Sequence, residues 1–338
     1  MIIVMRKSAT KEQTQSILQE IEEKGLKPMP LYGTERTVIA VIGDERILDR
    51  QHVASQPGVS NVMLVLPPYK LVARETKHED TVIKIREGVE IGGKEICVMA
   101  GPCAVENYEF VSQAAKAVKA AGAKILRGGA FKPRTGPYSF QGLGEKGLKI
   151  LKKVSEEEDI PFVTEVLNTK DLPLVSEYAD ILQVGARNMQ NFNLLEELGK
   201  QKRPVLLKRG MSAKIKEWLL AAEYIMSNGN PNVILCERGI RTFETEIRST
   251  LALQSVPLIK ELSHLPIIVD PSHAAGKPSL IPAMSKASIA AGADGIIVEV
   301  HPKPDEALCD GQQALTPEIF KDMMDEMKPV AEAVGKTM

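Results

Sequence analysis

Positively charged side chains lie at the ends of several apolar segments, where a charge without a partner is costly. The chain as a whole is nearly neutral, with 43 Lys and Arg against 44 Asp and Glu. Each of these cations could pair with a carboxylate from a helix. Seven of them gathered at the same end of the folded strands would instead suit a polyanionic substrate, because Arg binds phosphate or carboxylate as a fork and Lys binds them as a point charge. They are Arg127, Lys132, Arg134, Arg187, Lys208, Arg209 and Arg238.

A second group combines one thiol, one imidazole and two carboxylates: Cys103, His273, Glu299 and Asp310. Together they are suited to a divalent ion of borderline softness, namely Mn, Fe, Zn or Co. Taken singly, a cysteine such as Cys103 is more often a small buried apolar residue, and a histidine such as His273 is more often a hydrogen-bonded structural one, so the metal hypothesis depends on their convergence. Asp270, three residues before His273, could orient that imidazole or have a purely structural role.

Three further groups have less specific signals. Glu165 lies two residues after Val163 and is expected to face inward with it, either as a counter-ion or as a general acid or base. His301 shares the inward parity of Glu299 and has the same ambiguity, whereas His264 is expected to be structural. Cys309 precedes Asp310, so an inactivating disulfide with Cys103 is predicted if the two Cα atoms approach within about 7 Å.

Eight apolar segments must position these side chains, and helical patterns separate them. Such buried, unalternating strands are typical of a parallel sheet covered on both faces, and eight of them predict an α/β fold of the (β/α)8 TIM barrel type. An open doubly wound sheet is the alternative. Barrel closure would place the eighth strand between the seventh and the first, so that the four metal-ligating candidates converge. The segments are 96–103, 123–131, 161–167, 181–187, 204–210, 232–239, 266–273 and 295–302.

The first 68 residues have a different pattern, in the order β-α-β-β-α-β of a small ferredoxin-like α+β domain. Pro67-Pro68 marks the expected boundary. Residues 69–95 are expected to form a linker and a hairpin that caps the barrel, and residues 96–338 the catalytic barrel.

Composition argues against two classes of protein. The formal net charge of −1 lacks the surplus of basic residues that nucleic-acid-binding proteins usually have. No apolar run reaches the length of about 18 residues that spans a bilayer, and the N-terminus lacks the pattern of a signal peptide. Four scattered cysteines do not suggest a disulfide framework, so we expect a reducing, cytoplasmic location.

Several motifs resemble those of the 3-deoxy-arabino-heptulosonate 7-phosphate (DAHP) synthases, the enzymes that open the shikimate pathway of aromatic amino acid biosynthesis. The resemblance covers about residues 70–335 and is to the short-barrel subtype (type I beta). The motifs stand in order at the expected strand ends: GPC (101–103), LRGGAFKPRTGPYSFQGLG (126–144), GARN (185–188), LLKRG (206–210), CERGIRTFE (236–244), VDPSH (269–273), IVEVHP (297–302) and DG (310–311).

The resemblance implies a metal-dependent condensation of phosphoenolpyruvate with erythrose 4-phosphate. Metal would be held by Cys103, His273, Glu299 and Asp310, and phosphoenolpyruvate by Arg127, Lys132, Arg187, Lys208 and Arg238. Arg134 and Thr135 would take the phosphate of erythrose 4-phosphate, and Pro133 favours this sugar over the substrate of the octulosonate 8-phosphate synthases. The implied catalytic residues are Lys132, Glu165 and His273. The group that moves protons is left open between Lys132, Glu165 and a water bound to the metal.

The same resemblance implies a homo-oligomer, either a tetramer or a dimer, and a regulatory role for residues 1–68, with an aromatic amino acid as the inhibitor. Three other functions stay open at this point. They are an octulosonate 8-phosphate synthase, another metal-dependent phosphosugar lyase or isomerase, and a non-catalytic metabolite sensor.

Overall fold

The computed structural model describes residues 1–33, 36–66 and 68–338, and these form two compact units, Met1–Lys70 and Leu71–Met338. The division falls close to the expected Pro67-Pro68 boundary, although Pro67 itself lies outside the described residues. Residues 71–95, expected to link and cap, belong to the larger unit.

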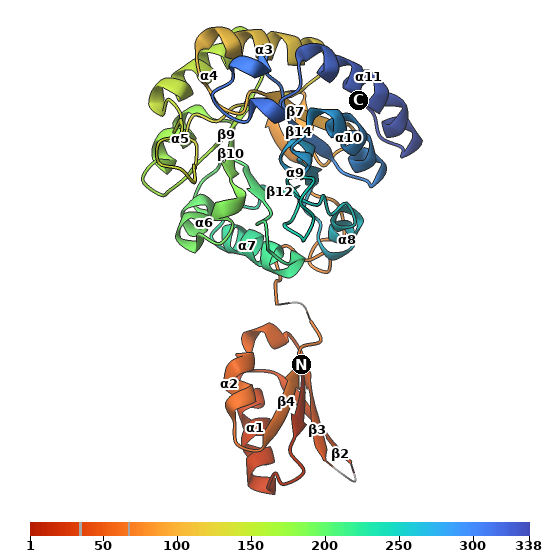
Figure 1. The fold of residues 1–338 in the computed structure, drawn as a ribbon. Helices are drawn as coiled ribbons and strands as arrows, with labels where there is room; N and C mark the ends of the chain where they lie inside the picture. Colours follow the sequence, from red (N-terminus) through yellow and green to blue (C-terminus); the bar gives the residue numbers. More distant parts are fainter. Residues whose placement is uncertain (34–35, 67) are drawn as a thin grey trace. The chain divides into compact units, whose positions relative to one another are not determined.

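The small unit is an antiparallel sheet with the strand order β2-β3-β1-β4 (Figure 1). Thr10 begins its first helix through a capping box with Gln13, which satisfies two backbone donors at the helix start. The order along the chain is the predicted β-α-β-β-α-β: β1 (Ile2–Met5), α1 (Lys11–Glu23), β2 (Lys27–Tyr32), β3 (Thr37–Ile42), α2 (Arg50–Ser55) and β4 (Val59–Met63).

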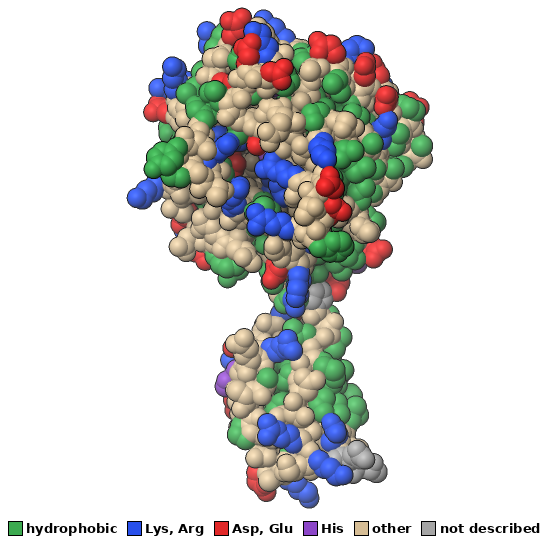
Figure 2. Space-filling model, in the orientation of Figure 1, with side chains coloured by type: hydrophobic (Ala, Val, Ile, Leu, Met, Phe, Trp, Pro, Cys, Tyr) green, Lys and Arg blue, Asp and Glu red, His purple; other side chains and the backbone are tan. Residues whose placement is uncertain are grey.

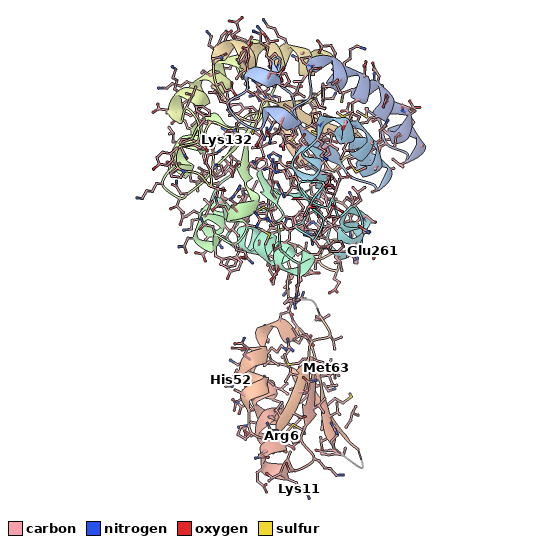
Figure 3. The ribbon with its side chains drawn as sticks, viewed as in Figure 1. Arg6, Lys11, His52, Met63, Lys132 and Glu261 are labelled. Carbon is pink, nitrogen blue, oxygen red and sulfur yellow. The ribbon has the colours of Figure 1, made fainter. Side chains whose placement is uncertain are left out.

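The two faces of this sheet differ in what covers them. On one face, Ile3, Ile39 and Val62 pack with apolar residues of α1 and α2 into a small core. The opposite face is apolar yet uncovered within the unit, since Met29 pairs across the sheet with Ala40 and is 44% exposed. Figure 3 labels Met63 on the sheet and His52 on helix α2. An uncovered apolar face of this kind commonly marks an interaction surface.

The larger unit is a closed barrel of eight parallel strands in the order β10-β11-β12-β13-β14-β7-β8-β9. It confirms the predicted (β/α)8 fold. Helices surround the strands on the outside (Figure 1). The strands are β7 (Cys97–Gly101), β8 (Ile125–Arg127), β9 (Phe162–Glu165), β10 (Ile181–Val184), β11 (Val205–Lys208), β12 (Val233–Glu237), β13 (Ile267–Val269) and β14 (Gly295–Glu299). The helices are α3 (Tyr108–Ala120), α4 (Glu145–Glu157), α5 (Leu172–Tyr178), α6 (Phe192–Gly199), α7 (Ile215–Ser227), α8 (Ser255–Leu262), α9 (Pro271–Ala275), α10 (Ile281–Ala290) and α11 (Pro317–Ala333).

Closure depends on the pairing of the last strand with the first. β14 pairs with β7 over five positions, and Glu299 stands opposite Gly101 at the carboxyl ends. Every residue of both strands is buried, as expected for strands covered on both faces. This register brings the C-terminal part of the chain next to Cys103.

A two-stranded hairpin packs under the barrel. Its strands are β5 (Ile83–Arg86) and β6 (Val89–Ile91). Ile83 and Ile91 are fully buried in one cluster with inward residues of the strands, such as Met99, Ile181 and Ile268. The hairpin therefore closes the amino-terminal end of the barrel and leaves the carboxyl end for a site.

The predicted seventh strand is too long. Segment 266–273 divides into β13, which ends at Val269, and the short helix α9, which carries His273. Asp270 accepts a hydrogen bond from the backbone N–H of His273, and Pro271 occupies the first helical turn, where a missing N–H costs nothing. Arg187 likewise lies in a 3-10 turn, Ala186–Asn188, rather than on a strand.

In the part of the chain that the structure describes, helices are either too short or too polar to traverse a bilayer.

Candidate functional site

Four side chains that could hold a metal ion meet at the carboxyl end of the barrel. The ligand atoms of Cys103, His273, Glu299 and Asp310 all lie within 4.8 Å of one another. Cys103 follows β7, His273 lies in α9, Glu299 ends β14, and Asp310 precedes a 3-10 turn. The structure thus brings together all four residues that the sequence nominated as ligands.

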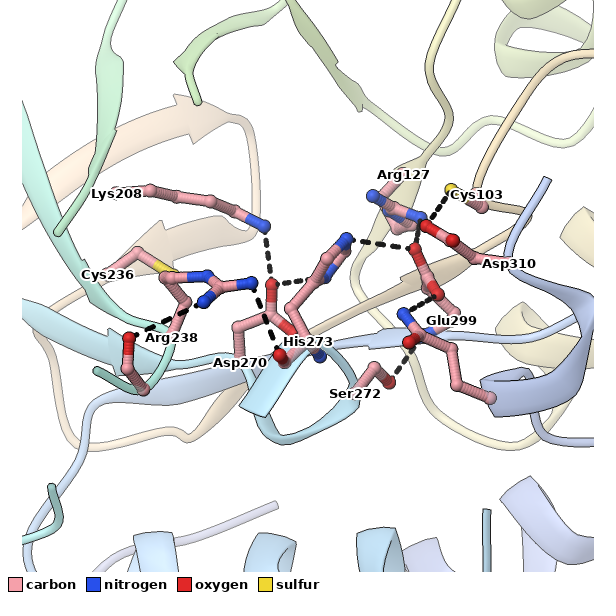
Figure 4. Close-up of polar contacts among 12 residues, drawn as sticks. Cys103, Arg127, Lys208, Cys236, Arg238, Asp270, Ser272, His273, Glu299 and Asp310 are labelled. Atoms are coloured by element: carbon pink, nitrogen blue, oxygen red, sulfur yellow. Dashed lines mark hydrogen bonds and ion pairs between the residues drawn. The ribbon is translucent and has the colours of Figure 1, made fainter. Parts of the chain in front are cut away.

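The contacts in this cluster link it to the barrel wall (Figure 4). The thiol of Cys103 lies 3.4 Å from Oδ2 of Asp310, and Nε2 of His273 lies 3.3 Å from Oε1 of Glu299. Arg127 donates from Nη1 to Oε1 of Glu299 at 3.0 Å and to the carbonyl of Pro102 at 3.1 Å. Burial opposes the charge of Glu299, but His273, Arg127 and Lys132 together lower its pKa to about 2.

Asp270 orients the imidazole of His273 from the other side. Its Oδ2 lies 2.8 Å from Nδ1 of His273 and also accepts from Nζ of Lys208. Figure 4 shows His273 between Asp270 and Glu299. Burial lowers the pKa of His273, which favours the neutral ring, and Asp270 then favours the proton on Nδ1. Nε2 is left to present its lone pair toward Glu299.

This donor set fits a divalent cation. With the proton of His273 on Nδ1, Nε2 and the ionised Glu299 both direct lone pairs at one small space, and a cation between them would satisfy both. One sulfur, one nitrogen and carboxylate oxygens suit Mn, Fe, Zn or Co. Without a cation, the contact with Cys309 and burial raise the pKa of Cys103, so metal binding would release its proton.

A basic cavity of about 350 Å³ adjoins the cluster, and two members of the cluster, His273 and Asp310, also line the cavity. Figure 2 shows Lys and Arg side chains gathered around the central hollow of the barrel unit. Pro133 and Thr135, from the motif after β8, also line it. Among the described residues the cavity contacts eight basic side chains: Arg127, Lys132, Arg134, Arg187, Lys208, Arg238, Arg241 and Arg248.

Glu165 is the buried acid within this basic cavity. Burial raises its pKa although Lys132, Lys208, Arg127 and Arg187 all favour its charged form. Its carboxylate lies so close to the backbone of the next strand that a Cβ on Gly185 would meet Oε1 at 2.0 Å. Only glycine allows this approach, which gives the GARN motif a physical role.

Lys132 reaches back toward the metal-ligating candidates. Its Nζ donates to the carbonyl oxygen and to Sγ of Cys103, both at 3.1 Å. A Cβ on Gly129 would meet its Cδ at 2.7 Å, so glycine again leaves room for a buried side chain. Burial opposes the charge of Lys132, but the acidic groups around it, Cys103 first among them, outweigh burial and raise its pKa.

Arg209 does not join the cavity, in contrast to the prediction. Neighbouring strand residues face opposite sides, so Lys208 points into the barrel and Arg209 points out of it. Arg209 donates to Glu237 at 2.7 Å and to the carbonyl of Ala213 at 2.9 Å, which makes it a structural ion pair. The alternation of inward and outward positions along the segment could have separated these two residues.

Arg241 and Arg248 line the cavity but were not predicted to do so. Both lie in the long connection between β12 and α8, where no strand periodicity indicates direction. The high density of Arg in that connection was the available signal.

The remaining candidates lie as follows. The sulfur atoms of Cys309 and Cys103 are 3.3 Å apart, and Arg134 donates a hydrogen bond to the sulfur of Cys309. His301 packs edge-on against Phe110 and accepts from the backbone of Lys303, outside the cavity lining. His264 bridges Thr81 and the carbonyl of Leu71 and is structural, as predicted.

Comparison with known proteins covers nearly the whole chain. Residues 80–334 match the model of the DAHP synthetase I family, and residues 1–67 match the model of the DAHP synthase ferredoxin-like domain. The chain is 51% identical over 335 residues to the phospho-2-dehydro-3-deoxyheptonate aldolase of Thermotoga maritima, which covers 99% of both chains. A 2-dehydro-3-deoxyphosphooctonate aldolase of Francisella tularensis is 30% identical over 258 residues, 71% of this chain and 93% of that one.

Solved structures agree with these matches. The crystal structure of the Thermotoga maritima DAHP synthase has a TM-score of 0.93 at 50% identity and covers 99% of this chain and 98% of that chain. A truncated form of that enzyme covers 80% of this chain and 98% of its own length, with a TM-score of 0.75. With both family models and a relative of 51% identity matched in order along one chain, this protein belongs to the DAHP synthetase I family.

Proposed function

We propose that the chain is a 3-deoxy-7-phosphoheptulonate synthase, which condenses phosphoenolpyruvate and erythrose 4-phosphate with water to give DAHP and phosphate. In this reaction C3 of phosphoenolpyruvate attacks the aldehyde carbon, positive charge develops at C2, water adds there, and phosphate leaves by C–O cleavage. The observation that carries the proposal is the basic cavity next to the four-residue donor cluster, because two anionic substrates must lie side by side in the reaction.

We assign phosphoenolpyruvate to the inner part of the cavity. Arg127, Lys208 and Arg238 are almost fully buried, so their charges act where water screens little. Arg187 and Lys132 line the same cavity and complete a surround for one carboxylate and one phosphate.

Erythrose 4-phosphate is assigned to the segment after β8. Arg134 and Thr135 are less buried than the inner cations and would take the sugar phosphate. Pro133, whose ring restricts the backbone between them and Lys132, is the residue by which this segment resembles the DAHP synthases rather than the octulosonate enzymes.

A bound divalent ion, held by Cys103, His273, Glu299 and Asp310, would supply Lewis-acid polarisation of the aldehyde. The chain's own groups would handle the protons. Lys132 has a raised pKa, so it stays protonated and is suited to stabilise negative charge by a charged hydrogen bond rather than to release its proton. Glu165 has a raised pKa as well and is suited to exchange a proton nearer to neutral pH than an ordinary carboxyl.

The test is phosphate release from phosphoenolpyruvate with erythrose 4-phosphate or arabinose 5-phosphate as the second substrate, and mass spectrometry of the product. We expect release with the four-carbon sugar and formation of the seven-carbon product. Preference for arabinose 5-phosphate would instead assign the octulosonate reaction, and release with neither sugar would contradict both.

We further propose that the small unit regulates the barrel and takes an aromatic amino acid as inhibitor. A binding role is supported by the uncovered apolar face of the sheet, where four large side chains are each at least 44% exposed: Met29, Leu31, Ile42 and Met63. We also propose that the chain acts as a homodimer or homotetramer. Four free thiols support a reducing, cytoplasmic location.

A further inference from the structure

Gln313 links the cluster of four metal-ligating candidates to the mouth of the basic cavity. It lies in the 3-10 turn Gly311–Gln313, directly after Asp310, and is 1% exposed. Its Nε2 donates to Oε2 of Glu299 at 2.6 Å, and its Oε1 accepts from Nη1 of Arg248 at 2.6 Å. A buried side chain with a strong partner at each end is held in a single orientation.

The chemistry of the two partners restricts the side chain that can lie between them. Arginine can only donate a hydrogen bond and an ionised carboxylate can only accept one, so the residue between them must accept at one end and donate at the other. A carboxamide does both without a charge. The two partners also fix which end of the amide is oxygen, because the reverse orientation would place donor against donor and acceptor against acceptor.

The consequence falls on Glu299. Its backbone N–H donates to Oγ of Ser272 at 3.0 Å, and Gln313 holds its Oε2, so both the backbone and one carboxylate oxygen are fixed. Oε1 is then the oxygen that faces His273 at 3.3 Å and accepts from Arg127. Without Gln313, Oε2 would be a buried charged acceptor with an unmet hydrogen bond, and the carboxylate could rotate to find another partner.

We propose that Gln313 is a positioning residue for the metal site: it selects the oxygen of Glu299 that faces the cluster, and Arg248 holds Gln313 in turn. This inference rests on the proposed metal-dependent function. It predicts that the geometry and affinity of the metal site depend on a side chain that touches neither metal nor substrate.

The experiment is Co²⁺ titration of metal-stripped full-length protein, followed by the visible absorption that reports cobalt coordination and thiolate ligation. Gln313→Met keeps the length of the side chain and removes both hydrogen bonds. We expect it to raise the Kd for Co²⁺ by about 10- to 100-fold, the usual effect of losing a group that orients a ligand, and to shift the visible bands. Arg248→Met leaves the contact of Gln313 with Glu299 but frees the amide to rotate, and it also removes the ion pair of Arg248 with Asp310 at 3.8 Å. A smaller rise of about threefold and a weaker band shift are therefore expected.

Two controls separate positioning from loss of stability. Gln312→Met makes the same change on the exposed neighbour in the same turn and should leave Kd and spectrum unchanged. Asn230→Leu removes an equally buried carboxamide, which donates to the backbone carbonyls of Leu198 and Arg203, and should lower stability without changing the cobalt spectrum.

The outcomes are distinct. A folded Gln313→Met with the Kd and spectrum of the parent protein overturns the inference and leaves the proposed function standing. If Gln313→Met does not fold, Arg248→Met decides, and parent-like Kd and spectrum again overturn it. If the parent protein binds no Co²⁺, or Cys103→Ser binds it with an unaltered spectrum, the metal site itself is wrong and the inference fails with it.

Discussion

At Glu165, burial and surrounding positive charge act in opposite directions on one carboxyl group. Burial prevails, so the pKa is raised despite Lys132, Lys208, Arg127 and Arg187. A group with that property costs stability when charged and is useful for proton exchange, a combination common at active sites.

The first prediction concerns Glu165→Gln. Above the raised folded-state pKa the wild-type carboxyl is charged in both states and burial costs stability, whereas below the ordinary value of 4.5 it is protonated in both states and the cost disappears. The variant should therefore unfold at a higher temperature than wild type at pH 8 and at the same temperature at pH 4. We expect kcat to fall about 100-fold or more, with loss of one limb of the pH profile. Equal unfolding temperatures at both pH values would contradict this account of the carboxyl.

A second prediction at this scale concerns Cys103, the softest of the four ligand candidates. Cys103→Ser, or removal of metal by a chelator, should lower turnover at least about 100-fold while circular dichroism shows an intact fold. Activity should return to the chelated wild-type protein on addition of Mn²⁺ or Co²⁺, but not to the variant. Full turnover by wild-type protein that elemental analysis shows to be metal-free would disprove the metal mechanism.

A third prediction follows from the 3.3 Å between the sulfur atoms of Cys103 and Cys309. A two-electron oxidant should remove two electrons and two protons from this pair, form a disulfide and abolish activity, and a dithiol reductant should restore it. Peptide mapping should find Cys103 linked to Cys309. Cys309→Ser should resist inactivation, whereas Cys97→Ala, which changes a thiol in the barrel core, should remain as sensitive as wild type.

At the scale of elements, the hairpin β5–β6 stabilises the barrel at the end away from the site. Ile91 is fully buried in the cluster that fills the barrel interior. Ile91→Ala should cost about 2–5 kcal/mol of unfolding free energy, the range for removing a buried aliphatic side chain. Denaturant unfolding measures this cost, with exposed Val82→Ala as the control. KM for both substrates should stay near wild type, and a large change in KM would mean that the hairpin also shapes the site.

The elements also show what sequence can predict. Eight apolar runs were sufficient for the barrel because parallel strands covered on both faces need no alternation, and the ligand candidates could be grouped because barrel closure brings the eighth strand to the first. Helix α9 was missed, since a five-residue helix has no periodicity to detect, although Asp270-Pro271 is a recognisable start signal.

The sequence pattern could not predict where side chains in loops would point. Arg248 and Gln313 meet across 65 positions of sequence, and neither lies on a strand whose parity would give a direction. Arg209 was assigned to the cavity from its charge and its position at a strand end, and the alternation of the strand places it outside.

For the whole molecule, the division between Lys70 and Leu71 allows the small unit to be removed without cutting the barrel. A chain that begins at Tyr69 should retain most of the turnover and lose whatever inhibition phenylalanine or tyrosine exerts on the full chain. Allostery requires two sites and a differential affinity between states, so the test is the inhibition curve of each amino acid on both chains, with size-exclusion chromatography as a check on assembly. Unchanged inhibition in the shorter chain would place the effector site in the barrel.

The pairing of β14 with β7 has a consequence for the order in which the protein matures. Cys103 and Asp310 are 207 positions apart, and no cluster exists until the last strand has closed the ring. A chain still emerging from the ribosome therefore has no site to offer a cation, and loading can only follow closure. Once bound, the ion would stabilise the closed ring over any opened one by mass action, so metal scarcity should shorten the lifetime of the protein as well as its activity.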